Sequence, residues 1–139
     1  MKLLFLVLCS LLTKAGLSQV YQFRAVKSTI AIIKEYKESD KLRWVDDDAL
    51  IVFNTKTHTV KVYGEKTVLF SWVKSSATPP TKLDENTKTT LVYDSIDVNG
   101  QECTIQIDFL KPNRNYVSEA LIYFRYKYDI MAYAVNVVK

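Results

Sequence analysis

The chain has 139 residues, of which 48% are hydrophobic, 24% charged and 12% aromatic, with 19 lysines and arginines against 15 aspartates and glutamates. Two cysteines, three glycines and three prolines exclude a disulfide-rich miniprotein, a collagen-like chain and a low-complexity chain. The hydrophobic content also excludes intrinsic disorder, because the chain can bury enough apolar surface to offset its conformational entropy. The length corresponds to one domain.

The first eighteen residues have the order of a secretory signal peptide. Lys2 supplies a positive charge, residues 3–12 form an uncharged apolar run, and the small residues Gly16 and Ser18 follow. The apolar run is about half of the ~20 residues that a membrane-spanning helix needs. We therefore expect cleavage after Ser18, and a mature protein without a membrane span that is secreted or periplasmic. A buried N-terminal strand or helix is the alternative.

Removal of this segment changes the charge and the cysteine count. Without Lys2 and Lys14, 17 basic side chains face 15 acidic ones. No block of five or six like charges remains, so we expect no nucleic-acid partner. Cys9 lies inside the apolar run after bulky residues, which disfavours a lipid anchor at this position. Cys103 is then the only mature cysteine, and an intramolecular disulfide is excluded.

Alternation of apolar and polar residues with period 2 dominates the mature chain, over 20–138. The clearest strand is 102–109, where Cys103 and Ile105 begin a buried face while Gln106 and Asp108 belong to a solvated one. The other β-rich runs that we expect to be strands are 49–54, 59–63, 67–72, 119–126 and 132–138. The run 28–37 is ambiguous, but its threonine and three isoleucines favour a strand.

Turn signals separate these runs. Asn99-Gly100 is the strongest, because this pair readily adopts the positive φ values of a tight hairpin. Residues 54–58, 64–66 and 111–115 give further hairpin turns, and 128–130 a weaker break. Short turns join antiparallel neighbours, so a meander of about eight or nine strands follows.

Two polar stretches interrupt the pattern. Residues 35–48 are too polar for a core strand, and residues 75–88, which contain Pro79-Pro80, predict a long loop. A loop of this length in a small domain is either a flexible connection or a binding lid.

The sequence thus predicts a single all-β domain over 19–139, in which an antiparallel meander closes into a small β-barrel or a strongly curled sheet. Closure would remove the exposed strand edges. The predicted inner set is Phe23, Ile30, Ile32, Val52, Val60, Val62, Phe70, Ile105, Ile107, Ile122 and Phe124. A barrel of this size permits either a packed interior or a ligand cavity.

Candidate catalytic groups are few. His58 is the only histidine and lies in a predicted turn, and Cys103 would pair with it only if its thiol were exposed. Asp46, Asp47 and Asp48 form an acidic cluster that suits a solvated loop, a hard cation or, least of all, catalysis, and it lacks the EF-hand spacing. We therefore expect a non-enzymatic protein with no catalytic residue, cofactor or metal site.

Aromatic residues are numerous near the C-terminus. Tyr123, Tyr126, Tyr128 and Tyr133 lie there, with Arg125 and Lys127 between them. Such interleaving can stack on sugars or bases, but tyrosines in strands more often pack their rings in a core.

The whole pattern, a signal peptide ending before Gln19 followed by the runs 20–25, 49–54, 60–63 and 93–103 and a tyrosine-rich end, resembles a group of small exported β-rich proteins of Gram-negative bacteria. No activity is assigned in that group. The resemblance therefore implies an exported β-domain and no site residues.

We expect a binding or accessory module for an unknown small ligand or protein partner, which uses the barrel mouth or the loop 75–88. A protein-interaction component of a periplasmic or surface assembly is the alternative, and a carboxylate-dependent hydrolase is a third reading. An apolar cavity of about 300 Å³ or more would favour the first. A filled interior with an exposed apolar patch would favour the second. Two carboxylates about 5–10 Å apart in a cleft would favour the third.

Overall fold

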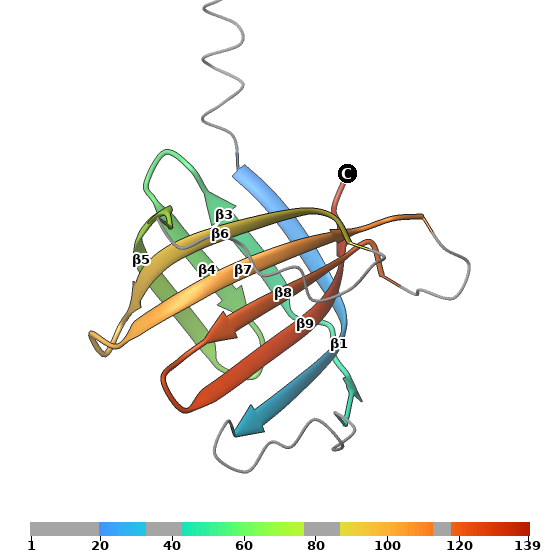
Figure 1. Ribbon diagram of the computed structural model, residues 1–139, viewed down its shortest axis with the longest axis horizontal. Coiled ribbons are helices and arrows are strands. Elements are labelled where there is room, and N and C mark those ends of the chain that lie inside the picture. The colour runs from blue at the N-terminus through green and yellow to red at the C-terminus, as the bar shows by residue number, and fades with distance from the viewer. Residues whose placement is uncertain (1–19, 33–42, 77–86, 113–117) are drawn as a thin grey trace, which may run out of the picture.

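The computed structural model in Figure 1 describes residues 20–32, 43–76, 87–112 and 118–139. The signal peptide predicted over 1–18, with Cys9, lies outside the described residues. So do most of the predicted loop 75–88, most of the turn 111–115, and the end of the ambiguous run 28–37.

Within the described residues the protein consists of nine β-strands and no helix. In chain order the strands are β1 (Val20–Ile32), β2 (Val45–Asp46), β3 (Leu50–Asn54), β4 (Thr59–Tyr63), β5 (Thr67–Ser75), β6 (Thr87–Asp97), β7 (Glu102–Leu110), β8 (Ala120–Arg125) and β9 (Asp129–Val137).

The strands form one antiparallel sheet whose two ends meet. From β3 to β9 each strand pairs with the next in sequence, and β1 pairs with both β3 and β9. Eight strands therefore form a closed ring of hydrogen bonds, in which the first and last strands lie side by side (Figure 1). The short strand β2 pairs with the second half of β1. The predicted antiparallel all-β meander is confirmed.

The predicted turns occur where their chemistry suggests. Gly100 has φ 77°, which a residue with a side chain adopts only with strain, and the β6–β7 hairpin turns at this point. In the β3–β4 turn, the Asn54 side chain accepts hydrogen bonds from the backbone N–H groups of Lys56 and Thr57, both at 3.1 Å. His58 ends the same turn with φ 54°.

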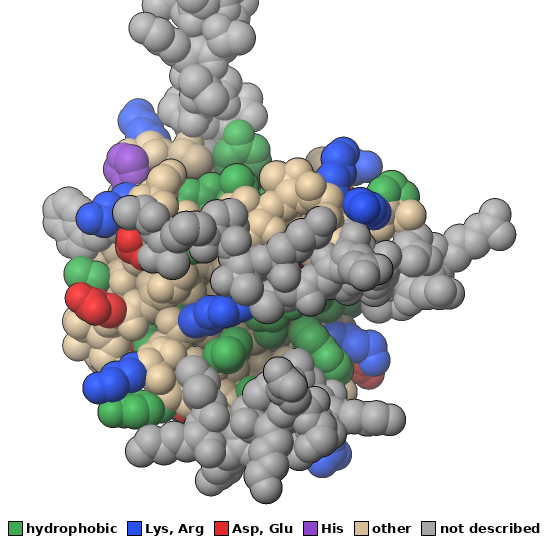
Figure 2. All heavy atoms as spheres, viewed as in Figure 1, with side chains coloured by type: hydrophobic (Ala, Val, Ile, Leu, Met, Phe, Trp, Pro, Cys, Tyr) green, Lys and Arg blue, Asp and Glu red, His purple; other side chains and the backbone are tan. Residues whose placement is uncertain are grey.

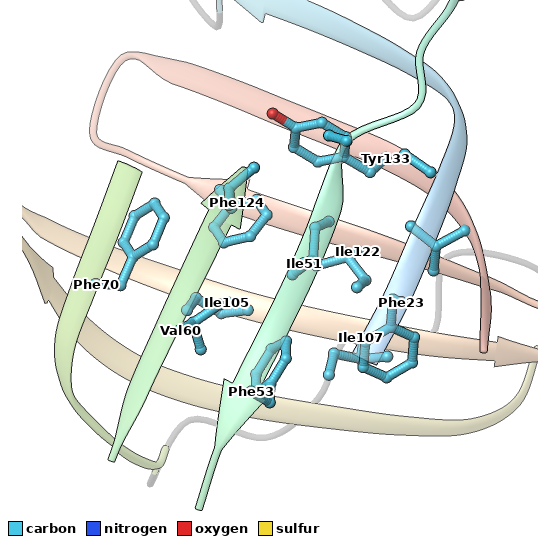
Figure 3. Packing of buried hydrophobic residues seen from close by; sticks show 14 of the residues in the cluster. Phe23, Ile51, Phe53, Val60, Phe70, Ile105, Ile107, Ile122, Phe124 and Tyr133 are labelled. Atoms are coloured by element: carbon cyan, nitrogen blue, oxygen red, sulfur yellow. The ribbon is translucent and has the colours of Figure 1, made fainter. Parts of the chain in front are cut away.

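The interior of the ring is filled by apolar side chains that alternate along the strands. Phe70 and Phe124 stack with centroids 4.8 Å apart and planes 23° apart, and Tyr133 meets Phe124 edge to face at 5.8 Å. Figure 3 shows these rings together with Ile51, Ile105 and Ile122 between the strands. Eight residues of the predicted inner set are buried: Phe23, Val60, Val62, Phe70, Ile105, Ile107, Ile122 and Phe124.

The prediction that Val52 faces the interior is wrong, because the buried residue is its neighbour Ile51. Residues that pair directly across an antiparallel sheet share a face. Ile51 pairs with buried Val62, whereas Val52 pairs with exposed Lys61. Ile51 therefore enters the core, and Val52 is half-buried on the outer face.

Ile30 and Ile32 are also predicted wrongly, for a different reason. The register of β1 against β9 shifts between Ala25 and Lys27, and after the shift Ile30 pairs with Met131 and Ile32 with Asp129. Both residues lie past the positions at which β1 pairs with β2 and β3, so β9 is the one described strand beside them. Ile30 is 71% exposed and Ile32 47% exposed.

Two boundaries of the polar stretches also change. Ser75 is the last residue of β5, and Thr87 and Lys88 begin β6, so the predicted loop 75–88 is shorter than expected. The stretch 35–48 contains the exposed two-residue strand β2, which is no core strand, as predicted.

Candidate functional site

An open pocket of about 1070 Å³ crosses β5, β6, β7 and β8. We call it the outer groove after six lining residues on its outer side: Lys74, Asp94, Glu102, Thr104, Arg125 and Lys127. Its inner side is lined by four residues that are buried or pack against the core: Val73, Ser95, Cys103 and Tyr126.

The strand register explains how these residues meet. Lys74 pairs with Asp94, Asp94 with Thr104, and Thr104 with Arg125, so one row of side chains runs across four strands. Cys103, which precedes Thr104 on β7, is buried in the core. Because successive residues of a strand point to opposite faces, the row lies on the outside of the ring.

The groove carries both signs of charge. Three cations, Lys74, Arg125 and Lys127, line it with the two anions Asp94 and Glu102. Figure 2 shows basic and acidic side chains interspersed on the left-hand side of the view, over β5, β6 and β7.

Arg125 is the charged side chain of the groove with a buried nitrogen that lacks a partner in the described residues. Its Nε atom is buried and has no hydrogen-bond partner in the described part of the chain. Its guanidinium carbon lies 5.5 Å from the centroid of the Tyr123 ring, which faces the same side of β8. A buried N–H group without an acceptor costs about 1–3 kcal/mol. The side chain is thus held in place with hydrogen-bonding capacity unused.

A buried polar cluster supports the end of the groove from inside the ring. The Tyr126 hydroxyl donates to Asp97 Oδ2 at 3.0 Å. Asp97 Oδ1 accepts from the backbone N–H groups of Asn99 and Gln101, at 2.9 and 3.0 Å. Asp97 therefore ties Tyr126, the residue after β8, to the β6–β7 turn.

Two side chains beside this cluster, Cys103 and Tyr126, have raised pKa values. Burial, with the charge of Asp97, raises the pKa of the Cys103 thiol to about 12. Burial, followed by the charges of Cys103 and Asp97 and the hydrogen bond to Asp97, also raises the pKa of Tyr126. At neutral pH both groups are protonated, and Cys103 lacks the thiolate that a nucleophilic cysteine needs.

His58 and Cys103 both border the groove. Cys103 is only 4% exposed, as its alternating pattern predicts, while His58 is an exposed turn residue whose carbonyl accepts from the Val73 N–H at 3.1 Å. The exposed thiol that a thiol–imidazole pair would require is therefore not present.

The three aspartates of the cluster predicted at 46–48 have separate environments and do not form one site. Asp46 forms an ion pair with Lys27 at 3.6 Å and its side chain is 95% exposed. Asp47 Oδ1 accepts from the backbone N–H of Ala49 at 2.9 Å, and Asp48 is exposed. Among the described residues, no group of three or more histidines, cysteines and acids is arranged to hold a metal ion.

The solvated face predicted for β7 is wrong at two positions. Gln106 is 3% exposed and Asp108 1% exposed, although both point away from the core. Asp108 Oδ1 accepts from Thr90 Oγ1 and from Gln106 Nε2, each at 3.0 Å. The hydrogen bonds explain why a carboxylate tolerates burial here.

Among the tyrosines near the C-terminus, the predicted packing role is seen for two. Tyr133 packs against Phe124, and the ring of Tyr126 lies 6.5 Å from that of Phe70. The prediction that this region packs in the core does not hold for Arg125, which lines the groove. Its place there depends on residues of β5, β6 and β7 that lie far away in the sequence.

Comparison of the chain with protein families, with curated proteins and with solved structures finds no match. Within the described residues, no helix has the length and apolar character needed to cross a membrane.

Proposed function

We propose that the protein is a non-enzymatic binding module whose small ligand lies in the outer groove. The observation that carries the proposal is the groove itself, because about 1070 Å³ is ample for a small molecule. Thr104 and Arg125 lie on paired strands of a hydrogen-bonded ring, so the groove has a rigid floor.

The interior of the ring supports an external site. Seven large apolar side chains are less than 2% exposed: Phe70, Phe124, Ile51, Ile105, Ile122, Val60 and Val135. They occupy the space in which a ligand of the predicted apolar cavity would lie. The proposal therefore moves the binding site out of the filled interior to the pocket at this end of the ring, which is lined by the outer row and by inner residues such as Cys103 and Tyr126.

We propose a non-enzymatic role because the two potentially reactive groups beside the groove, Cys103 and Asp97, are protonated or engaged in hydrogen bonds. The Cys103 thiol, with a pKa of about 12, keeps its proton, and Asp97 is engaged by the β6–β7 turn. Both groups serve the structure of the hairpin, and the groove residues are left for binding.

The small-ligand proposal is tested by identifying what accompanies the purified protein. Extraction followed by mass spectrometry should detect a small molecule bound to the wild type. Thr104→Trp should displace the ligand by filling the groove from its centre, whereas Lys61→Trp, an exposed outer-face position on β4, should retain it. Retention of the same ligand by the Thr104→Trp protein would overturn the proposed site.

We also propose that the protein is exported and released into the periplasm or the medium by cleavage after Ser18. The charge, apolar run and small residues of the first eighteen positions support this, as does the resemblance to exported β-rich proteins. N-terminal sequencing of the protein recovered from the medium or periplasm should begin at Gln19. An intact Met1 terminus on the folded protein would contradict it.

A second candidate function is a docking role in a periplasmic or surface assembly. Val45 pairs with Ser28, and Ile30 and Ile32 follow Ser28 at two-residue intervals on the same face of β1. Val45, Ile30 and Ile32 are 49%, 71% and 47% exposed, so they form an apolar stripe at the end of the strand pair. Sedimentation and cross-linking of the wild type and of Ile30→Lys test this role. Identical behaviour of the two proteins in all mixtures would refute it.

A further inference from the structure

We propose that the ligand of the outer groove bears an oxyanion, a carboxylate or a phosphate, and that Arg125 binds that group. This inference rests on the proposed function, because it specifies the chemistry of the ligand in the same groove.

Arg125 has the geometry of an anchor for a planar oxyanion. A guanidinium presents several N–H donors in a fixed fork, which matches the two oxygens of a carboxylate or phosphate. The contact with Tyr123 at 5.5 Å holds the guanidinium, so little side-chain freedom is lost when a ligand binds. Its Nε is buried, so the donors offered to a ligand oxygen are the terminal N–H groups of the guanidinium of this groove-lining residue.

Neighbouring groups in the groove add to this site. Thr104 is the residue directly opposite Arg125, and its hydroxyl is able to donate to the same oxyanion. Lys127 lies two residues beyond Arg125 and also lines the groove. Together they supply one neutral donor and a second positive charge beside the guanidinium.

The two acids of the groove set a limit on the charge of the ligand. Asp94 lies between Lys74 and Thr104 in the cross-strand row, and Lys74 offsets its charge. Glu102 is opposite Ile96 and lies two residues before Thr104. A polyanion would meet both carboxylates, so the groove favours a ligand with a single oxyanionic group.

The rest of the ligand is expected to be apolar or aromatic. Ile96, 37% exposed and opposite Glu102, lines the groove on the same face as the charged row. A ring attached to the oxyanion would cover Ile96 while its head group meets Arg125. Phenyl phosphate and benzoate are the simplest probes with this shape, and they differ in the source of the oxyanion.

The test is a titration of the full chain by calorimetry or by two-dimensional NMR. We expect phenyl phosphate or benzoate to bind at least about tenfold more tightly than benzyl alcohol or benzylamine, since hydrogen bonds to charged groups carry the difference. Binding should weaken as the salt concentration rises. Arg125→Gln should reduce the affinity at least about tenfold, while Arg125→Lys, which keeps the charge and loses the fork, should lose less.

Matched variants separate this site from general surface charge. Lys61→Gln removes an exposed cation on β4 and should leave the affinity unchanged. Glu102→Gln should increase the affinity for the anionic probes. Circular dichroism of each variant checks that the sheet is retained.

Three results would overturn the inference: absence of binding by both anionic probes, equal binding of benzylamine, or an Arg125→Gln protein that binds like Lys61→Gln. A neutral ligand that accompanies the wild type and is displaced by Thr104→Trp would refute the oxyanion while the proposed groove stands. A ligand that Thr104→Trp fails to displace refutes the groove itself.

Discussion

Replacing Tyr126 by phenylalanine removes one hydroxyl and leaves the ring that packs near Phe70 at 6.5 Å. The hydroxyl donates to Asp97 Oδ2 at 3.0 Å, and Asp97 is 8% exposed. A hydrogen bond to a charged acceptor contributes about 1.5–3 kcal/mol. Asp97 keeps its two backbone donors through Oδ1 in the variant. We therefore expect Tyr126→Phe to lower the free energy of unfolding by about 2 kcal/mol, a large part of the 5–15 kcal/mol typical of a domain.

Urea unfolding followed by circular dichroism at pH 7 measures this change. Tyr63→Phe, on the exposed face of β4, is the matched control and should stay within about 0.5 kcal/mol of the wild type. Combining Tyr126→Phe with Asp97→Asn should give less than the sum of the single effects, because both remove the same bond. A Tyr126→Phe protein as stable as Tyr63→Phe, or strictly additive effects with Asp97→Asn, would refute the role assigned to this bond.

The pH dependence provides an independent readout of the same group. Burial raises the pKa of Tyr126 in the folded state above its ordinary value of 10.0. The neutral phenol then contributes its full stability below pH 10, and this contribution is lost as the pH rises above 10. The wild type should lose more stability than Tyr126→Phe above that pH. If the stabilities of the two proteins fell in parallel above pH 10, burial of the Tyr126 hydroxyl would not raise its pKa as stated.

Three further predictions concern the core, the hairpin and the thiol. Phe124→Leu removes the stacked contact with Phe70 and should cost about 1–3 kcal/mol in urea unfolding, and a cost below 0.5 kcal/mol would argue against the stack. Gly100→Ala meets no atom within 4 Å but has φ 77°, so thermal unfolding should show a loss of about 1 kcal/mol from backbone strain alone, and none if the turn relaxes. The Cys103 thiol contributes stability that is complete below pH 9.0 and lost between pH 9.0 and about 12, so Cys103→Ala should flatten the stability curve there, and an unchanged slope would refute it.

The period-2 pattern was sufficient to predict the class of the fold and most of its core. Ile105, Ile107, Ile122 and Phe124 alternate without interruption, and each is buried. The errors have local causes. Ile30 and Ile32 lie past the positions at which β1 pairs with β2 and β3, and a pattern of residue types does not reveal how far along a strand its neighbours extend.

The outer groove was not predictable from the sequence for a different reason. Lys74, Asp94, Thr104 and Arg125 are separated by 20, 10 and 21 positions, and they meet only through the stagger of four strands. That stagger depends on pairing between strands, including the register shift between Ser71 and Lys74. Arg125 and Lys127 lie among tyrosines in the sequence, but nothing local places Arg125 opposite Thr104.

The pairing of β1 with β9 has a consequence for how the protein folds. Phe23 pairs with Val137, and the Val138 N–H donates to the Gln22 carbonyl at 2.9 Å, so the seam joins residues more than 110 positions apart. Contacts of such separation form slowly, because the loop that they close is nearly the whole chain. During synthesis β1 emerges before β9 and lacks this partner until β9 is made. Deletion of β9 should therefore leave an open sheet in which β8 and β1 have unpaired edges, a form prone to association between chains.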